Sequence, residues 1–472
     1  MGREAAPFGA AAPERSISRL RAASFLRGVE STRATEAASV ALFFVHALVL
    51  LVCYYVLKTL REPLLLTEGS PEIKSIAQAV VALVLLVAVP LYGAVAKHVG
   101  RRKLVRAITA FFAANLVLFC LLGRAGADVA VAYYVWVGVF GVVIVAQFWA
   151  HAADAFDVES GERVFPVIAG GAVLGGFAGP LLFRVLYPVL GVWPLMLVCA
   201  GLLALTLPLM EWSRRAVPET FRARDAESVA SVRAGLSLVL NDRYLRGLAV
   251  LVVLLNCVNT TGEYLLSKHV VAYADRAVAL DSGLDRGAVI GAFYASFYFA
   301  VNTLAVATQL LLVGRIFRWV GVAGAVLVGP LLAVVGYALA AFVPVFAILK
   351  IVKTVENGVN YSLTNTVRHS LYLPLAPGAK YEGKTAIDAF FWRFGDVLQA
   401  GIVYTGVHAL GFGAREFACV NLGLALLWLL VAARLSRGYP RRKRPSAIHS
   451  CDDPRSAAAA SNAPARFRRP CP

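Results

Sequence analysis

The chain has 472 residues, of which 59% are hydrophobic and only 16% are charged, and its mean hydropathy is +0.70. This composition excludes a soluble multidomain enzyme and is typical of an integral membrane protein. The net charge of +18 does not indicate a nucleic-acid partner, because the basic residues gather on alternate sides of successive apolar segments, as the positive-inside rule predicts.

Apolar runs of about 20 residues, enough for a helix to cross a hydrocarbon core of about 30 Å, recur between residues 39 and 436. We expect an all-α protein of the lipid bilayer with about twelve transmembrane helices. Basic clusters follow the second, sixth and last segments, which assigns those sides and both termini to the cytoplasm. In a bacterium the membrane would be the inner one.

The first membrane helix is predicted over residues 38–60, after an Ala- and Arg-rich stretch, residues 1–37, that we expect to be a disordered cytoplasmic arm. Tyr54, Lys58, Arg61 and Glu62 share one face at the end of this helix. Two interpretations stay open, a snorkelling cluster at the membrane surface and a face that contacts a solute.

Two loops with the same glycine spacing indicate an internal repeat. GAVAKHVGRRK follows the second helix (residues 75–96), and GRIFRWVG follows the eighth. The first loop resembles the signature between helices 2 and 3 of the major facilitator superfamily, although Lys97 replaces the usual aspartate. We expect two six-helix halves, residues 38–211 and 244–436, joined by a cytoplasmic linker, residues 212–243, and followed by a disordered basic tail, residues 437–472.

In the first half, helices are predicted over residues 104–123, 130–150 and 190–211. Residues 147–163 form an acidic cytoplasmic loop with Asp154, for which a solvated loop without a further role is the alternative. The fifth helix has Gly171, Gly175 and Gly179 at every fourth position, before Pro180. This ridge resembles a motif of facilitator antiporters, and close helix packing explains it equally well.

In the second half, the seventh helix (residues 246–266) places Asn259 and Glu263 on one face, and helices follow over residues 319–341 and 344–366. The last of these has a polar stripe with Lys350, Lys353 and Asn357. A lysine at the bilayer centre costs about 2.5 to 3.5 kcal/mol. Two of them one turn apart indicate an anion site that faces a water-filled cavity.

Residues 378–385, GAKYEGKT, match the phosphate-loop pattern. That loop needs a preceding strand and an acidic strand end for magnesium, and neither is apparent here. We interpret the match as a chance one in a cytoplasmic loop. The eleventh helix is predicted to begin near Lys384, with Asp388, Trp392 and Gln399 on the same stripe and Arg393 facing away. The twelfth is predicted over residues 416–436.

The sequence contains no Ser/His/Asp, HExxH, CxxC or dinucleotide-binding pattern. We therefore predict no catalytic residues, no metal site and no cofactor. Lysines and arginines with fewer carboxylates in a helical cavity indicate a small-molecule anion as substrate.

Three segments resemble the ATP/ADP antiporter (nucleotide transporter) family of plastids and intracellular bacteria. They are YVLKTLREPLLLTEG at residues 55–69, the stretch from FW to RVFP at residues 148–166, and GKTAID to RFG at residues 383–395. The resemblance implies a facilitator-like fold and exchange of nucleotides. By position, Arg61, Asp154 and Lys384 match charged residues of that family, and either Asn259 or Glu263 matches its acidic residue on helix 7. Asp396 stands where the family usually has lysine, which marks a divergent, bacterial-type member.

Our leading hypothesis is ATP:ADP exchange by alternating access. The alternatives are a proton-coupled facilitator of another organic anion, with Glu263 or Asp388 as proton carrier, and a non-transporting membrane scaffold. The predicted substrate-binding residues are Lys58, Arg61, Asp154, Asn259, Glu263, Lys350, Lys353, Asn357, Lys384, Asp388 and Arg393.

Overall fold

The computed structural model describes residues 34–99, 101–156, 158–217, 232–343 and 345–443, and all of the regular structure in these ranges is helical. The first half of the chain contains α2 (Ala34–Glu68), α3 (Pro71–His98), α4 (Arg101–Arg124), α5 (Ala130–Ala155), α6 (Val158–Leu190) and α7 (Val192–Arg215). The second half contains α8 (Val232–Asn241), α9 (Arg243–Leu280), α10 (Arg286–Ala307), η2 (Thr308–Leu312), α11 (Val313–Ala325), α12 (Val328–Phe342), α13 (Phe346–Val359), η3 (Asn360–Thr364), α14 (Asn365–Ser370), α15 (Pro377–Ala386), η4 (Ile387–Phe391), α16 (Trp392–His408) and α17 (Ala414–Lys443).

The prediction of an integral membrane protein is confirmed. Nine stretches of the described chain are long and apolar enough to cross a membrane, and α12 is a shorter apolar helix. Two further segments, residues 346–370 and 377–408, are each interrupted by a π-helical turn, η3 and η4. The prediction of about twelve helices thus compares with nine candidate spans and one shorter apolar helix in the described chain.

Side-chain caps fix several helix starts. The Ser70 hydroxyl accepts the Ile73 backbone N–H at the start of α3, where proline occupies the first turn. Asp242 accepts the N–H groups of Tyr244 and Leu245 at the start of α9, and Asp285 accepts that of Ala288 in α10. At each of these starts the preceding helix ends only a few residues earlier, so the capping residue belongs to a short connection.

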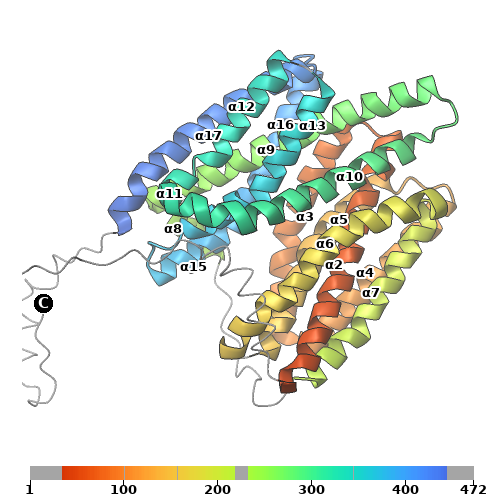
Figure 1. The fold of residues 1–472 in the computed structure, drawn as a ribbon, viewed down its shortest axis with the longest axis horizontal. Helices are drawn as coiled ribbons and strands as arrows, with labels where there is room; N and C mark the ends of the chain where they lie inside the picture. The colour runs from red at the N-terminus through yellow and green to blue at the C-terminus, as the bar shows by residue number, and fades with distance from the viewer. Residues whose placement is uncertain (1–33, 100, 157, 218–231, 344, 444–472) are drawn as a thin grey trace, which may run out of the picture.

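The helices form two groups. Figure 1 shows α2 to α7 together as one bundle and α9, α11 to α13, α16 and α17 as another, with α10 running along the boundary. One apolar core lies within residues 40–217 plus Ala295, and a second lies within residues 239–439. The limits of the two halves, residues 38–211 and 244–436, stay a prediction.

Several predicted loops are wrong. The two predicted loops with matching glycine spacing are largely helical, since residues 93–98 belong to α3 and residues 314–320 to α11, which has a kink at Gly321. The chain is helical from Ala130 to Ala155 and again from Val158, so most of the predicted acidic loop at residues 147–163 belongs to α5 and α6. Residues 378–385 belong to α15 and the helix continues into η4, so the phosphate-loop match lies in a helix and not in a cytoplasmic loop. A helix cannot wrap its backbone N–H groups around a phosphate as a phosphate loop does, because most of them are already paired within it. The predicted linker also contains a helix, α8, and residues 218–231 of it lie outside the described residues.

Candidate functional site

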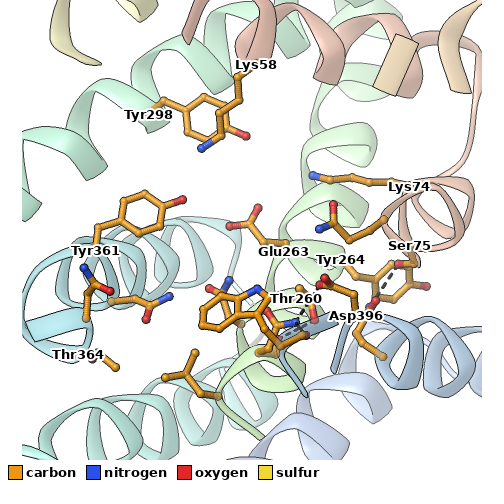
Figure 2. Close-up of a pocket in the computed structure, with 18 of the residues that line it drawn as sticks. Lys58, Lys74, Ser75, Thr260, Glu263, Tyr264, Tyr298, Tyr361, Thr364 and Asp396 are labelled. Atoms are coloured by element: carbon orange, nitrogen blue, oxygen red, sulfur yellow. Dashed lines mark hydrogen bonds between the residues drawn. The ribbon is translucent and has the colours of Figure 1, made fainter. Parts of the chain in front are cut away.

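A cavity of about 470 Å³ lies between the two groups of helices. Its volume falls within the range of pockets that hold small molecules. Figure 2 shows Lys58, Lys74, Glu263 and Tyr361 around the same space, although they come from four different helical segments. Its polar, charged and aromatic lining consists of Lys58, Arg61, Lys74, Ser75, Gln78, Tyr134, Asn256, Asn259, Thr260, Glu263, Tyr264, Tyr298, Asn360, Tyr361, Thr364, Asn365, Arg368, Trp392, Asp396 and Gln399.

Lys58 is buried and surrounded by aromatic rings. Its Nζ lies 4.6 Å from the ring centre of Tyr298, 5.4 Å from that of Tyr55 and 5.6 Å from that of Tyr361. No carboxylate of the described chain lies within ion-pair distance of this ammonium group. Cation–π contacts stabilise a charge in such a place only partly. We call these three tyrosine rings the Lys58 cage. The ammonium group inside it has no carboxylate of the described chain beside it.

Arg61 and Lys74 share one carboxylate, that of Glu62. The Arg61 Nε lies 3.1 Å from Glu62 Oε1, and the Lys74 Nζ lies 2.8 Å from Glu62 Oε2. Glu62 is fully buried and does not line the cavity, whereas both cations do. Arg61 also lies over the ring of Tyr134, 4.5 Å from its centre. These cations form the wall built by α2 and α3.

The carboxylates that line the cavity come from the other group of helices. Glu263 Oε1 accepts a hydrogen bond from Asn357 Nδ2 at 2.6 Å. Asp396 Oδ1 accepts one from Asn256 Nδ2 at 2.9 Å, whereas its Oδ2 is buried without a hydrogen bond in the described structure. Arg393 Nη1 lies 3.7 Å from that oxygen. The cavity is therefore cationic on the α2–α3 side and holds two carboxylates on the α9 and α16 sides.

Arg368 adds a cation to this second side. Its guanidinium lies 4.7 Å from the ring centre of Trp392 and its Nη1 lies 3.4 Å from Asp388 Oδ1. Arg368 and Trp392 line the cavity together. A planar aromatic group could stack beside this pair while an anionic group meets the arginine.

The structure brings four of the predicted site residues together at the cavity: Lys58, Arg61, Asn259 and Glu263. Asn357, Asp388 and Arg393 lie behind its wall, since each contacts a lining side chain, Glu263, Arg368 and Asp396 respectively. Asp154, Lys350, Lys353 and Lys384 are not among the lining residues.

The two lysines of the polar stripe lie in different surroundings. Lys353 is fully buried, and its Nζ lies 3.1 Å from Glu356 Oε2 and 3.2 Å from Asn259 Oδ1. Lys350 is exposed and lies near the ring of Phe293. The prediction that both lysines face one cavity is therefore wrong. Lys350 and Lys353 both lie in α13, three residues apart, so their different surroundings come from the helices that they meet: Lys353 contacts Asn259 of α9, and Lys350 lies near Phe293 of α10.

Two π-helical turns affect the residues that follow them. η3 and η4 each insert extra residues into the helical turn, which rotates the face beyond them relative to the face before them. Tyr361 within η3, Arg368 beyond it, and Trp392 and Asp396 beyond η4 line the cavity, whereas Lys384, which precedes η4, does not. An uninterrupted period of 3.6 residues does not apply across such turns.

The sequence-based prediction missed Lys74, Ser75 and Gln78. The predicted start of the second helix at residue 75 left Lys74 outside it, whereas α3 begins at Pro71. The signal was present, because Ser70 followed by proline is a typical helix start. Polar residues in the first turns of an otherwise apolar helix would then have indicated a solute-facing position.

Comparisons with known proteins agree with this architecture. The model of a family described as Major Facilitator Superfamily matches residues 42–395. The search among curated proteins gives no match. The family matched is broader than the ATP/ADP antiporters, so that narrower resemblance stays a prediction.

Three solved structures have the same fold. The nucleoside transporter NupG gives a TM-score of 0.59 at 12% identity, over 85% of this chain and 99% of that one. A POT family transporter in complex with 5-aminolevulinic acid gives 0.60 at 12%, over 86% and 96%. A bacterial homolog of the human lysosomal transporter Spinster, inward-facing and unoccupied, gives 0.58 at 11%, over 88% and 100%. At such low identities the likeness establishes the fold alone.

Proposed function

Since the chain belongs to the Major Facilitator Superfamily and is a multi-pass secondary transporter, we propose that it exchanges nucleotides, ATP for ADP, across its membrane by alternating access. In this cycle the two groups of helices rock about the central cavity. The cytoplasmic location of both termini is part of the same proposal.

The observation that carries the proposal is the Lys58 cage. A buried ammonium group among three tyrosine rings, with no carboxylate beside it in the described chain, favours an anion in the cavity. Phosphate oxygens accept strong charge-assisted hydrogen bonds from lysine and arginine. Arg61 and Lys74 on the same wall supply further donors to a substrate with several phosphates.

The aromatic side chains support a substrate with a ring. Trp392 beneath Arg368, and Tyr361 near Lys58, present ring faces to the same cavity. Stacking on such faces suits a nucleobase and gives little to inorganic phosphate or a small dicarboxylate.

Exchange follows from the charge of the empty cavity. Without an anion, reorientation would move the uncompensated Lys58 charge through a poorly hydrated state, which is costly. With a nucleotide bound, that charge is compensated. The loaded carrier therefore changes conformation more readily than the empty one, and each uptake step requires a return step with a counter-substrate.

The test is uptake of labelled ATP into proteoliposomes. We expect fast uptake into vesicles preloaded with ADP and slow uptake into vesicles that contain buffer only. The proposal fails if preloading has no effect while another organic anion is taken up by the same vesicles.

A proton-coupled facilitator is the second candidate. It is favoured by Asp396, a cavity-lining carboxylate whose Oδ2 is buried without a hydrogen bond in the described structure. Of the earlier candidates, Glu263 lines the cavity and Asp388 is paired with Arg368. An imposed pH gradient would then drive uptake without a counter-substrate, and Asp396→Asn or Glu263→Gln would abolish that drive.

A further inference from the structure

We propose that Glu62 is an internal counter-anion that the substrate replaces, and that this replacement loosens the contacts that join the two groups of helices at one end of the cavity. The inference deepens the proposed function and rests on its central requirement, an anionic substrate. It makes Glu62 a positioning residue that acts through two cations of the cavity wall, Arg61 and Lys74.

One buried carboxylate holds both cations. Arg61 and Lys74 bind different oxygens of Glu62, at 3.1 Å and 2.8 Å. Glu62 has no exposed surface, whereas the two cations reach the cavity. A phosphate group that enters the cavity would meet Arg61 and Lys74 as donors already engaged with an internal anion. Substrate and Glu62 therefore compete for the same two cations.

Two of these residues, Glu62 and Lys74, also form hydrogen bonds with α9 and α10. Tyr298 of α10 donates its hydroxyl hydrogen bond to Glu62 Oε1 at 3.0 Å. Lys74 donates to the Ser267 hydroxyl of α9 at 2.9 Å and to the Tyr294 hydroxyl of α10 at 3.4 Å. Each of these bonds joins α2 or α3 of the first group either to α9 of the second or to α10 on the boundary between them.

Further bonds between the groups lie at the same end of the molecule. The Arg286 guanidinium donates to the backbone carbonyls of Leu66 and Thr67, where α2 ends. The Tyr264 hydroxyl donates to Glu72 at 2.8 Å, in the first turn of α3. Glu62 and Lys74 thus lie where α2, α3, α9 and α10 close against one another, and their contacts hold that end closed.

Competition for the cations links binding to this closure. When Arg61 and Lys74 turn toward a bound phosphate, Glu62 loses its ion pairs and Lys74 loses its partners on α9 and α10. A buried carboxylate without a cation is costly, so the conformation that hydrates it gains in population. A ligand shifts a conformational equilibrium only by its difference in affinity for the two states, and this exchange of partners supplies such a difference.

Glu62→Gln tests the competition directly. Glutamine keeps the shape of the side chain and removes its charge, which leaves Arg61 and Lys74 free for the substrate. We expect the dissociation constant for ADP, measured by calorimetry on the purified protein, to fall by about fivefold or more, a typical coupling between linked sites. The maximal exchange rate should fall as well, because no internal anion recaptures the cations when the substrate leaves.

Glu68→Gln is the matched control, since Glu68 lies on the same helix, is exposed and does not line the cavity. It should change neither affinity nor rate. If the unsubstituted protein binds ADP, unchanged or weaker ADP binding by Glu62→Gln, at a thermal stability close to that of the control, would overturn the inference.

Tyr298→Phe gives a second test if Glu62→Gln does not fold. It removes the hydroxyl that crosses between the groups and keeps the ring beside Lys58. Because the closure is weakened, leakage of labelled ADP from vesicles without external nucleotide should rise severalfold. Unchanged leakage would contradict the proposed closure.

Pyrophosphate separates this inference from the nucleotide proposal. If the unsubstituted protein binds pyrophosphate but neither ATP nor ADP, and Glu62→Gln binds pyrophosphate more tightly, nucleotide exchange is wrong and the role of Glu62 stands. If Glu62→Gln binds none of the three anions more tightly, the role of Glu62 is wrong whatever the substrate.

Discussion

Two buried lysines of this protein have opposite surroundings. Lys353 is enclosed by Glu356, Asn259 and, at 3.9 Å, Glu263, so its charge is matched within the protein. Lys58 has only tyrosine rings near its ammonium group. The first arrangement is that of a structural ion pair and the second that of a binding site. Substitution of each lysine should therefore affect a different property.

We predict that Lys58→Met weakens nucleotide binding by about tenfold or more, since a charge-assisted hydrogen bond is worth about 1.5 to 3 kcal/mol. Thermal stability should change little, because the methionine stem fills the cage. The measurement is the dissociation constant for ADP. Lys350→Met, at an exposed position on α13, should leave binding unchanged. Equal effects of the two substitutions would contradict the assignment of Lys58.

We predict that Lys353→Met destabilises the protein by about 3 to 5 kcal/mol, because it leaves the carboxylate of Glu356 buried without its cation. Unfolding in detergent by heat or denaturant measures the loss. In the double variant with Glu356→Met as well, most of the stability should return, since the pair is replaced by apolar side chains. A double variant as unstable as the single one would contradict this account.

At the scale of elements, the glycine ridge of α6 sets the distance to α2. A Cβ atom added to Gly175 would lie 2.7 Å from Leu51 Cβ and 2.8 Å from the Leu48 carbonyl oxygen. One added to Gly171 would lie 2.3 Å from the Phe44 carbonyl oxygen. The two helix backbones touch here, so the packing role expected from the sequence accounts for these glycines.

Gly175→Ala is therefore expected to cost about 1 to 3 kcal/mol of stability, as for overpacked sites. The readout is the midpoint of thermal unfolding. Gly201→Ala on α7 is the control, because an added Cβ atom there has no heavy atom within 4 Å. A loss as large in the control would mean that helix propensity or expression, and not the contact with α2, determines the result.

Element boundaries were the weaker part of the sequence-based prediction. The polar and acidic stretch at residues 147–163 suggested a loop, yet among its described residues all but Phe156 are helical. Polar side chains are accommodated in these helices where they meet other protein groups, as His151 does with the Met210 carbonyl oxygen. Hydropathy alone cannot register such partners, because they come from a distant part of the chain.

At the scale of the whole molecule, the proposed topology of about twelve membrane helices would have both ends of the chain on one side of the membrane. The positive-inside rule assigns that side to the cytoplasm. A cysteine introduced at Leu284, between α9 and α10, should then react with a membrane-impermeant reagent in intact cells. One introduced at Leu373, between α14 and α15, should react only after lysis. The protein without added cysteines gives the background, and the reverse pattern would invert the proposed orientation.

The sequence by itself determined the membrane class and the all-helical fold, because long apolar runs and basic clusters are local features of the chain. The internal repeat stays a prediction. The sequence also found Lys58, Arg61, Asn259 and Glu263, which lie on uninterrupted helices where the period of 3.6 residues holds. Only the tertiary structure decided which remaining charges meet the cavity. The π-helical turns η3 and η4 rotate the faces of two segments, and the carboxylate of Glu62 finds the cation Lys74 on α3. Those positions depend on how separate helices pack, which no local pattern records.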